Sequence, residues 1–538
     1  MNIAGHLPRV AAERPDALAV ACPDRRGGFV EATFRQLDDR SDAIARGLLR
    51  SGVSAGERAA VLVKPGQDFF ALTFALFKAG VVPVLIDPGI GVRNFGRCLA
   101  EAEPSLFFGI PPAVLARKLL GWGRATIRRI YKVGPAGPMT LDGLAVLGRE
   151  GAPTLHEPSA EEIAAILFTS GSTGPPKGAI YTHEIFNAQV EILRSTYDIE
   201  PGEIDLCTFP LFALFAPALG MSAIVPEMDA TRPGRADPRR IIDTIRGRNV
   251  TTMFGSPALI RRVADYGREH KIKLATLRRA ISAGAPVPAK VIERFASLLP
   301  ENVQIHTPYG ATEALPVATI GSELILGRTR AETDRGRGVC VGRPVEGMRV
   351  EVIRVDDGPI AAWSDALLAT AGEVGELVVR GPVVTGGYYR RPEADALSKI
   401  IDPADGSTWH RMGDLGRRDI DGLLWFYGRK SHRVVTPDRV YYTIAVEAVF
   451  NTVDGVARTA LVGVDGPSGR RPVLCVESTL EKSHRRKLIE ELRVAGSRYD
   501  HTREVDIFLF HPGFPVDIRH NAKIRRETLA IWAARKLR

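Results

Sequence analysis

The chain of 538 residues contains little cysteine. Its five cysteines are scattered, and no two of them stand in a Cys-x-x-Cys pair: Cys22, Cys98, Cys207, Cys340 and Cys475. An odd number of isolated cysteines argues against a disulfide framework and against a cysteine-based metal site. We therefore expect the protein to work in a reducing compartment.

Two further patterns are missing, those of a signal peptide and of a membrane-spanning helix. The residues from Met1 to Arg9 lack the charged-then-apolar order of a signal peptide, so the sequence predicts a cytoplasmic protein. The segment from Leu206 to Pro226 carries no charge, but Pro210, Pro217 and Gly220 interrupt it. Because proline breaks a spanning helix, we expect this segment to form a buried wall of a folded domain.

The chain also lacks enough acid to balance its basic residues. Its 72 Lys and Arg side chains oppose 62 Asp and Glu, which leaves a net charge of +10. This surplus raises nucleic acid as a candidate partner, but the basic clusters at 117–132 and from Arg519 onward lie in no recognised nucleic-acid-binding module, so we expect no such partner. Residues 117–132 mix basic and apolar side chains, which predicts either an ordinary surface helix or a peripheral contact with an anionic membrane.

A loop rich in glycine and hydroxyl residues follows the apolar run 166–168 and ends on Lys177. Glycines let successive backbone N–H groups converge on an anion, hydroxyls add donors, and a lysine adds positive charge. The loop fails the Walker pattern Gly-x4-Gly-Lys-Ser/Thr, because Pro175 and Pro176 precede the lysine. A plain linker is the alternative. The predicted phosphate-binding residues are Thr169, Ser170, Gly171, Ser172, Thr173, Gly174 and Lys177.

This loop resembles the phosphate loop of the acyl-adenylating (AMP-forming) superfamily, which includes acyl-CoA synthetases, luciferases and peptide-synthetase adenylation domains. Residues 307–313 resemble a second motif, whose aromatic residue and glycine border adenine and whose Thr and Glu approach phosphates and magnesium. The corresponding residues are Tyr309, Gly310, Thr312 and Glu313. Since Mg²⁺ is bound by one or two carboxylates plus phosphate oxygens, the resemblance implies ATP and Mg²⁺ as cofactors, with Glu313 as the metal ligand.

Three more motifs follow the superfamily's order. Residues 282–288 resemble the other wall of the adenine pocket, here formed by Gly284, Ala285 and Pro286. In residues 412–416, Asp414 matches the carboxylate that binds the ribose hydroxyls, and in residues 427–430, Arg429 matches the arginine beside ribose and phosphate. A lone Asp or Arg is usually a solvated surface charge, so the argument depends on the order of the motifs.

The C-terminal segment 514–525 resembles the tail that carries the adenylation lysine. Lys523 is the matching residue, and the resemblance implies that it bridges the substrate carboxylate and the α-phosphate, as a preorganised charge does in a transition state. Ala522 stands where glycine is usual, and Asn521 where Ser or Thr is usual. A surface lysine in a basic tail is the alternative.

Alternating strand and helix patterns predict an α/β fold. Residues 59–63, 68–79 and 81–86 read as strand, helix and strand, which together form a βαβ unit, and strand-like runs return at 250–254 and 277–282. The length predicts more than one domain.

The resemblance implies an acyl-adenylate-forming enzyme fold with two domains. Residues 1–428 would form a large N-terminal domain of mixed sheets and helices that holds AMP and the acyl pocket. Residues 429–538 would form a small mobile α+β domain that carries Lys523 and rotates between two half-reactions. The uncharged segment 206–226 would line the acyl pocket, with plain core as the alternative.

Departures from the acyl-CoA synthetase pattern bear on the second half-reaction. Those enzymes usually continue Gly-Arg-x-Asp, with the Asp as hinge, and then present a glycine-rich strand to pantetheine. This chain has Ser431 at the hinge position, and Tyr441 and Tyr442 follow without the glycine. Because only glycine permits that close backbone approach, the tyrosines would crowd the pantetheine track, and transfer to CoA is disfavoured.

The segments 209–220, 307–313 and 514–523 together resemble the β-lactone synthetases of bacterial long-chain olefin biosynthesis. The resemblance implies that a 2-alkyl-3-hydroxy fatty acid is adenylated, and that its own hydroxyl then closes a β-lactone and expels AMP. Such a step is effectively unimolecular. Other enzymes of that pathway are implied as partners. The alternatives are a long-chain fatty acyl-CoA synthetase and, outside catalysis, an acyl-AMP-binding scaffold.

Overall fold

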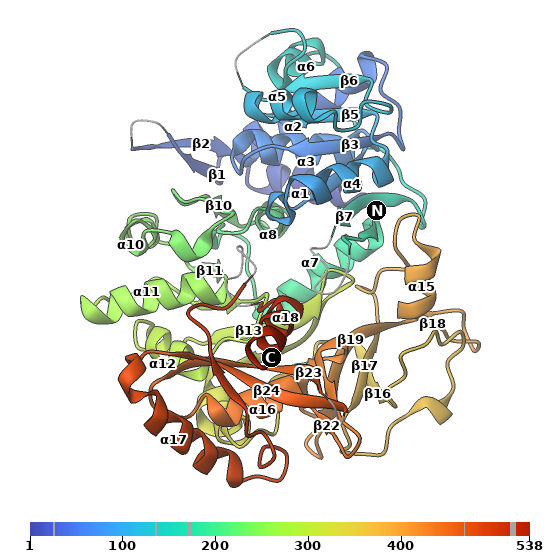
Figure 1. The fold of residues 1–538 in the computed structure, drawn as a ribbon. Helices are drawn as coiled ribbons and strands as arrows, with labels where there is room; N and C mark the ends of the chain where they lie inside the picture. The colour runs from blue at the N-terminus through green and yellow to red at the C-terminus, as the bar shows by residue number, and fades with distance from the viewer. Residues whose placement is uncertain (25–26, 135–136, 169–174, 467–468, 517–522) are drawn as a thin grey trace.

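Figure 1 shows the computed structural model of the chain, which describes residues 1–24, 27–134, 137–168, 175–466, 469–516 and 523–538. Within these residues the strands form a six-stranded sheet, a fourteen-stranded sheet and two small C-terminal sheets. The blue N-terminal sheet lies at the top of Figure 1, the green strands lie in the middle, and the orange and red C-terminal part lies at the bottom. The architecture is therefore α/β, as the sequence predicted.

The six-stranded sheet has the order β6-β5-β3-β4-β7-β8 and is parallel except for β8, which runs antiparallel to β7. The predicted βαβ unit is confirmed, because β3, α3 and β4 follow one another and the two strands pair in parallel. The strands are β3 (Arg58–Leu62), β4 (Val82–Ile86), β5 (Leu106–Gly109), β6 (Arg129–Lys132), β7 (Ile163–Phe168) and β8 (Gly178–Thr182).

The helices around this sheet bury its faces. Helix α3 is rich in phenylalanine, and all its residues from Phe69 to Lys78 are buried. The helices of this part are α1 (His6–Glu13), α2 (Phe34–Arg50), α3 (Gln67–Lys78), α4 (Val92–Ala102), α5 (Pro111–Leu120), α6 (Leu141–Leu147) and α7 (His183–Tyr197). The predicted surface helix in 117–132 thus corresponds to the last turn of α5, while residues 129–132 form β6.

The larger sheet has a parallel centre, β10-β9-β11-β12-β13, and antiparallel strands from β14 to β16. Its strands are β1 (Leu18–Pro23), β2 (Phe29–Thr33), β9 (Ile204–Leu206), β10 (Ser222–Ile224), β11 (Thr252–Gly255), β12 (Arg279–Ser282), β13 (Ile305–Ala311), β14 (Ala314–Gly321), β15 (Val339–Pro344), β16 (Arg349–Ile353), β17 (Gly375–Arg380), β18 (Lys399–Ile401), β19 (Thr408–Arg418) and β20 (Leu424–Arg429). The predicted strands near 250–254 and 277–282 are confirmed as β11 and β12.

One face of the parallel centre packs against three amphipathic helices, whose buried isoleucines, leucines and valines meet Leu206, Met253 and Ile305. The other face turns toward the core shared with α2, α3 and α7. The remaining helices before residue 430 are α8 (Pro210–Ala213), α9 (Phe215–Ala218), α10 (Pro238–Gly247), α11 (Pro257–Glu269), α12 (Ala289–Ala296), α13 (Ser322–Leu324), α14 (Arg330–Asp334) and α15 (Pro392–Ser398).

The chain after Arg429 has its own small sheets and its own two hydrophobic cores. The long hairpin β23–β24 is covered by α16 and α17 on one core and by α18 on the other. The elements are β21 (Val434–Val435), β22 (Val440–Tyr441), α16 (Thr443–Phe450), β23 (Val456–Gly466), β24 (Gly469–Ser478), α17 (Arg485–Ser497), β25 (Phe508–Phe510) and α18 (Arg526–Lys536).

Two global features bear on the sequence predictions. All five cysteines are buried free thiols. Among the helices of the described residues, none combines the length and the apolar character that crossing a bilayer requires. The uncharged segment 206–226 folds instead as the end of β9, two short helices and β10.

Candidate active site

Three residues from distant motifs meet on interior strands of the larger sheet. Tyr309 lies on β13, Asp414 on β19, and Arg429 ends β20. The Tyr309 hydroxyl donates to Oδ2 of Asp414 at 2.7 Å, and Nη1 of Arg429 donates to Oδ1 at 2.7 Å. Burial and then Asp414 raise the pKa of Tyr309, and Asp414 raises the pKa of Arg429. The site therefore joins a protonated phenol, the buried Asp414 side chain and a guanidinium in one chain of hydrogen bonds.

The turn between β13 and β14 depends on Gly310. An added Cβ there would lie 2.6 Å from the carbonyl oxygen of Ala314 and 2.7 Å from Cδ1 of Leu315. Only glycine permits this approach, so the tight hairpin requires it. The turn carries Thr312, whose carbonyl oxygen accepts a hydrogen bond from the Tyr181 hydroxyl at 2.5 Å. The end of β13 and the turn after it thus bring four predicted residues close together: Tyr309, Gly310, Thr312 and Glu313.

Glu313 is held by the segment that follows β17. The Tyr388 hydroxyl donates to Oε1 of Glu313 at 2.6 Å, and the backbone N–H of Thr385 donates to the Glu313 carbonyl oxygen at 2.9 Å. Burial first, and then Glu313, raise the pKa of Tyr388, which keeps its hydroxyl protonated as a donor. The carboxylate of Glu313 is therefore fixed in orientation while it remains half-buried.

The ammonium groups of two lysines lie near the ring of Tyr388. Nζ of Lys177 is 4.8 Å from the centroid of the Tyr388 ring, and Nζ of Lys399 is 6.0 Å from it. Lys399 is buried and donates to the Thr385 carbonyl oxygen and, at 3.3 Å, to its hydroxyl. Burial lowers the pKa of Lys399 to about 8, although Glu313 and Asp395 oppose the change. Cations from two segments therefore converge near Glu313, an arrangement suited to a polyphosphate.

The remaining predicted residues of the nucleotide site stand at two strand ends. Gly284, Ala285 and Pro286 follow β12, and Gly284 has a positive φ of 98°, which favours glycine. The predicted phosphate-loop residues Thr169 to Gly174 connect β7 to Lys177 and lie outside the described residues.

Lys523 lies in the C-terminal part, at an exposed position three residues before the start of α18. Its neighbour Ile524 forms an antiparallel bridge with Val516. At the start of α18, Nη2 of Arg526 donates to Oε2 of the buried Glu447 at 2.8 Å. The lysine is thus attached to a well-anchored helix start, while residues 517–522, including Asn521 and Ala522, lie outside the described residues.

An apolar cavity of about 80 Å³ adjoins these motifs. Its wall includes Phe212, Phe215 and Phe254, and it reaches Ala283 and Pro308, which directly precede Gly284 and Tyr309. The predicted buried wall at 206–226 is confirmed, because this segment supplies part of the lining. An apolar group placed here would have its polar end next to the nucleotide motifs.

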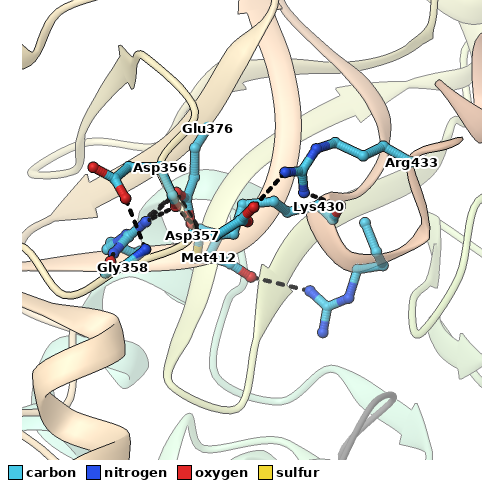
Figure 2. A network of polar contacts seen from close by, with 9 residues as sticks. Asp356, Asp357, Gly358, Glu376, Met412, Lys430 and Arg433 are labelled. Atoms are coloured by element: carbon cyan, nitrogen blue, oxygen red, sulfur yellow. Dashed lines mark hydrogen bonds and ion pairs between the residues drawn. The ribbon is translucent and has the colours of Figure 1, made fainter. Parts of the chain in front are cut away.

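A second polar network surrounds the junction between the large sheet and the C-terminal part (Figure 2). Nζ of Lys430 donates to Oε2 of Glu376 at 3.0 Å and to the Asp356 carbonyl oxygen at 2.7 Å. The same carboxylate oxygen accepts from Nη2 of Arg411 at 2.7 Å, and Nη2 of Arg433 donates to Oδ2 of Asp357 at 2.6 Å. The side chains of Glu376 and Arg411 are 1% and 2% exposed, so this is a buried charge triad.

The tyrosines expected near the pantetheine track lie at the same junction. Tyr441 is buried and donates to Oε2 of Glu504 at 2.9 Å, and Tyr442 packs edge-on against Tyr427 with the ring centroids 5.7 Å apart. Both line a cavity of about 400 Å³ that also contacts Arg335. These side chains therefore occupy the space beside β22 that a glycine would leave open.

Sequence reasoning missed Tyr388 and Lys399, which hold and surround Glu313. The run Gly-Tyr-Tyr at 387–389, before a proline-started helix, was the available signal for Tyr388. Lys399 gave no signal, because a lysine in a polar-apolar sequence is normally exposed. Sequence reasoning also missed Asp205, whose carboxyl group lies in the wall of the apolar cavity.

Comparison with known proteins gives the family. The model of the AMP-binding enzyme family matches residues 7–389. The olefin beta-lactone synthetase of Stenotrophomonas maltophilia is 50% identical, with 100% of this chain and 98% of that protein covered. That of Xanthomonas campestris pv. campestris is 49% identical, with 99% and 98% covered.

Solved structures agree on the fold. The O-succinylbenzoate coenzyme A synthetase MenE of Bacillus subtilis, in complex with ATP and magnesium ion, superposes with a TM-score of 0.75, at 19% identity over 97% of this chain and 98% of that one. The large mixed-sheet part and the smaller C-terminal part are those of an adenylate-forming enzyme. The motif resemblance is thereby confirmed, and the chain belongs to the AMP-binding enzyme family.

Proposed function

We propose that this protein is an ATP-dependent β-lactone synthetase that converts a 2-alkyl-3-hydroxy fatty acid into a β-lactone and releases AMP and pyrophosphate. The observation that carries the proposal is the apolar cavity that ends beside the nucleotide motifs at Ala283 and Pro308. The full-length identity of about half to two olefin beta-lactone synthetases supports it.

The nucleotide roles follow the polar contacts. Asp414, held between Tyr309 and Arg429, would accept hydrogen bonds from the ribose hydroxyls, and Arg429 would face the phosphates. Gly284, Ala285 and Pro286 on one side, and Tyr309 with Gly310 on the other, would enclose adenine. Lys177, with the loop from Thr169 to Gly174, would bind the phosphates, for which Thr312 adds a hydroxyl.

The residues present fit a magnesium ion that arrives with ATP. The described part of the chain contains no group of three or more His, Cys, Asp or Glu side chains able to form a dedicated metal cage. Mg²⁺ needs no such cage when substrate phosphates supply most of its ligands. Glu313, oriented by Tyr388, would provide the protein carboxylate, and the bound ion would neutralise phosphate charge.

The chemistry has two steps. A carboxylate oxygen of the fatty acid attacks the α-phosphorus of ATP, the bond to the pyrophosphate oxygen breaks, and an acyl-AMP forms. The 3-hydroxyl oxygen then attacks the acyl carbon, gives up its proton, and the carbon–oxygen bond to AMP breaks. Lys523 would stabilise the charge that develops in the first step. No external acceptor is needed for the second.

We place the domain boundary between residues 428 and 429, with residues 429–538 as the mobile domain that brings Lys523 to the site. Its separate cores support this division. Ser431 in place of the hinge Asp, and Tyr441 and Tyr442 in place of a glycine, support an internal acceptor over CoA.

Partners and location are also proposed. Three exposed leucines of α5, next to Arg117 and Lys118, support a peripheral contact with anionic lipid. Other enzymes of olefin biosynthesis would receive the lactone. The five free thiols support a cytoplasmic location.

The decisive experiment supplies ATP, Mg²⁺ and a 2-alkyl-3-hydroxy acid without CoA. We expect the β-lactone, AMP and pyrophosphate in equal amounts. The second candidate, a long-chain fatty acyl-CoA synthetase, is favoured by the cavity of about 400 Å³ at the domain junction, where CoA could lie. A plain long-chain acid with CoA separates the two: efficient acyl-CoA formation would replace the lactone proposal.

A further inference from the structure

The apolar cavity contains one carboxyl group, on the strand that forms its floor. Asp205 is the middle residue of β9 and pairs in register with Ala223 of β10 and Thr252 of β11. Side chains alternate along a strand, so Leu206 enters the core under α10 to α12 while Asp205 faces the opposite side, where it lines the cavity. A central strand of a parallel sheet normally carries an apolar residue there.

The hydrogen bonds of the cavity leave acceptors open. Among the described residues, the Asp205 carboxyl accepts one hydrogen bond, from the Cys207 thiol at 3.2 Å, which is a weak donor. Gln189 donates through Nε2 to the Leu315 carbonyl oxygen at 2.8 Å, whereas its buried Oε1 has no partner within the described part of the chain. A substrate that placed only a saturated hydrocarbon chain in the cavity would offer no hydrogen-bond donor to the Asp205 carboxyl or to Oε1 of Gln189.

The other polar groups of the wall are already engaged. The Thr252 hydroxyl donates to Oε2 of Glu203 at 3.1 Å, and the Tyr197 hydroxyl is 3.3 Å from that of Thr319. Next to Thr252, Arg279 is paired with Glu203. Arg279 lowers and Glu203 raises the pKa of Asp205, but burial dominates and raises it to about 7.

We propose that Asp205 recognises the hydroxyl group of the substrate and makes the cavity selective for a hydroxylated acid over the plain acid of the same length. This inference rests on the proposed function and deepens it. A hydroxyl donor would satisfy the Asp205 oxygen that the thiol leaves open, whereas an acid without it would leave a buried polar group unpaired. Such sites discriminate strongly against the analogue that lacks the partner.

The test compares two acids that differ only in the hydroxyl, a 2-alkyl-3-hydroxy acid and its 3-deoxy analogue. Acid-dependent exchange of pyrophosphate into ATP reports activation alone, without ring closure. We expect the wild type to favour the hydroxy acid in kcat/KM, and Asp205→Leu to reduce that preference by about tenfold or more. The matched control is Phe212→Leu in the same wall, which should change both acids to the same extent.

The outcomes are separable from those of the proposed function. Lactone formation by the wild type tests the proposed function, and the ratio of the two acids tests the inference. An unchanged ratio in a folded Asp205→Leu variant, or no preference in the wild type, would overturn the role of Asp205. If Asp205→Leu fails to fold, Asp205→Val, which suits a central strand, replaces it with the same expected loss.

Discussion

In the proposed two-step chemistry, Lys523 is the residue whose substitution should matter most for adenylation. Its position before α18 ties it to a helix start that Arg526 and Glu447 anchor. We expect Lys523→Ala to reduce adenylation at least tenfold, equivalent to about 1.4 kcal/mol of transition-state stabilisation. Pyrophosphate exchange measures this step. The exposed Lys536 in the last turn of α18 gives the control, because Lys536→Ala removes the same charge from the same C-terminal part of the chain. Equal activity of the two variants would remove Lys523 from the mechanism.

Asp205 also carries a prediction about stability. Its pKa is about 7 in the folded protein, whereas an unfolded aspartate titrates near about 3.9. The folded state therefore binds more protons between these values, and the contribution of this group, fully present at low pH, is lost as the pH rises through about 7.

Asp205→Asn cannot ionise, so it should be more stable than the wild type at pH 8, by an amount on the order of 3 kcal/mol, and the difference should shrink toward pH 4. Urea unfolding at several pH values measures it. Asp454→Asn, at an exposed position, is the control and should show no such trend. A pH-independent difference would mean that the Asp205 carboxyl is ionised in the folded state.

At this scale the sequence predicted residues with a motif and missed residues without one. Tyr309, Asp414 and Arg429 were found because each stands at a fixed place in a recognisable segment. Tyr388 and Lys399 act through contacts made only after folding, between segments far apart in the chain. Their functional environment is a product of tertiary packing, which no local pattern encodes.

At the scale of elements, strands and helices with strong periodicity were predicted well. β3, α3 and β4 follow the predicted order, with boundaries within a residue or two. The segment 117–132 was less regular than expected, because α5 ends at Leu120 and Gly121 adopts a left-handed φ of 67°. Such a break depends on a single glycine within an otherwise continuous basic pattern.

Helix α5 presents three exposed leucines, Leu115, Leu119 and Leu120, whose exposed fractions are 57%, 76% and 49%. With Arg117 and Lys118 in the same turns, this surface suits anionic lipid. We expect binding to phosphatidylserine vesicles at low salt and its loss on Leu119→Glu, read by co-sedimentation. Val494→Glu on α17 removes an exposed apolar residue elsewhere and should bind as the wild type does. Absence of vesicle binding by the wild type would leave α5 as an ordinary surface helix.

At the scale of the whole molecule, the polar network at the junction bears on the proposed movement of the C-terminal part. Lys430 donates to Glu376, which is also paired with Arg411, and Arg433 donates to Asp357 (Figure 2). Two ionic contacts therefore hold the segment that follows β20 against the large sheet part. If the substrate's own hydroxyl attacks the acyl-AMP, no CoA has to enter the site. The C-terminal part then has less need of a second orientation for the second step. The order of the domains was predictable from the resemblance, but this triad was not, because its members come from β17, β19 and the turn after β20.

We expect Lys430→Met to loosen the hinge while adenylation is retained. Removing one cation from the triad leaves Glu376 with Arg411 alone, and loss of a partner from a buried ion pair costs about 3–5 kcal/mol in severe cases. Limited proteolysis between residues 429 and 434 should accelerate. Lys482→Met, at an exposed site, is the control. Unchanged cleavage would show that the triad does not restrain the hinge.

The five buried thiols give the molecule a set of internal reporters. Burial raises the pKa of Cys22, Cys98 and Cys475 to about 12 and that of Cys340 to about 11. The thiolate is the species that reacts with alkylating reagents, so each cysteine should remain unmodified until the structure around it unfolds. Cys475 alone lies in the C-terminal part, on β24. A short alkylation pulse followed by peptide mass analysis would therefore reveal, without any engineered label, whether the two parts of the molecule melt together or in sequence.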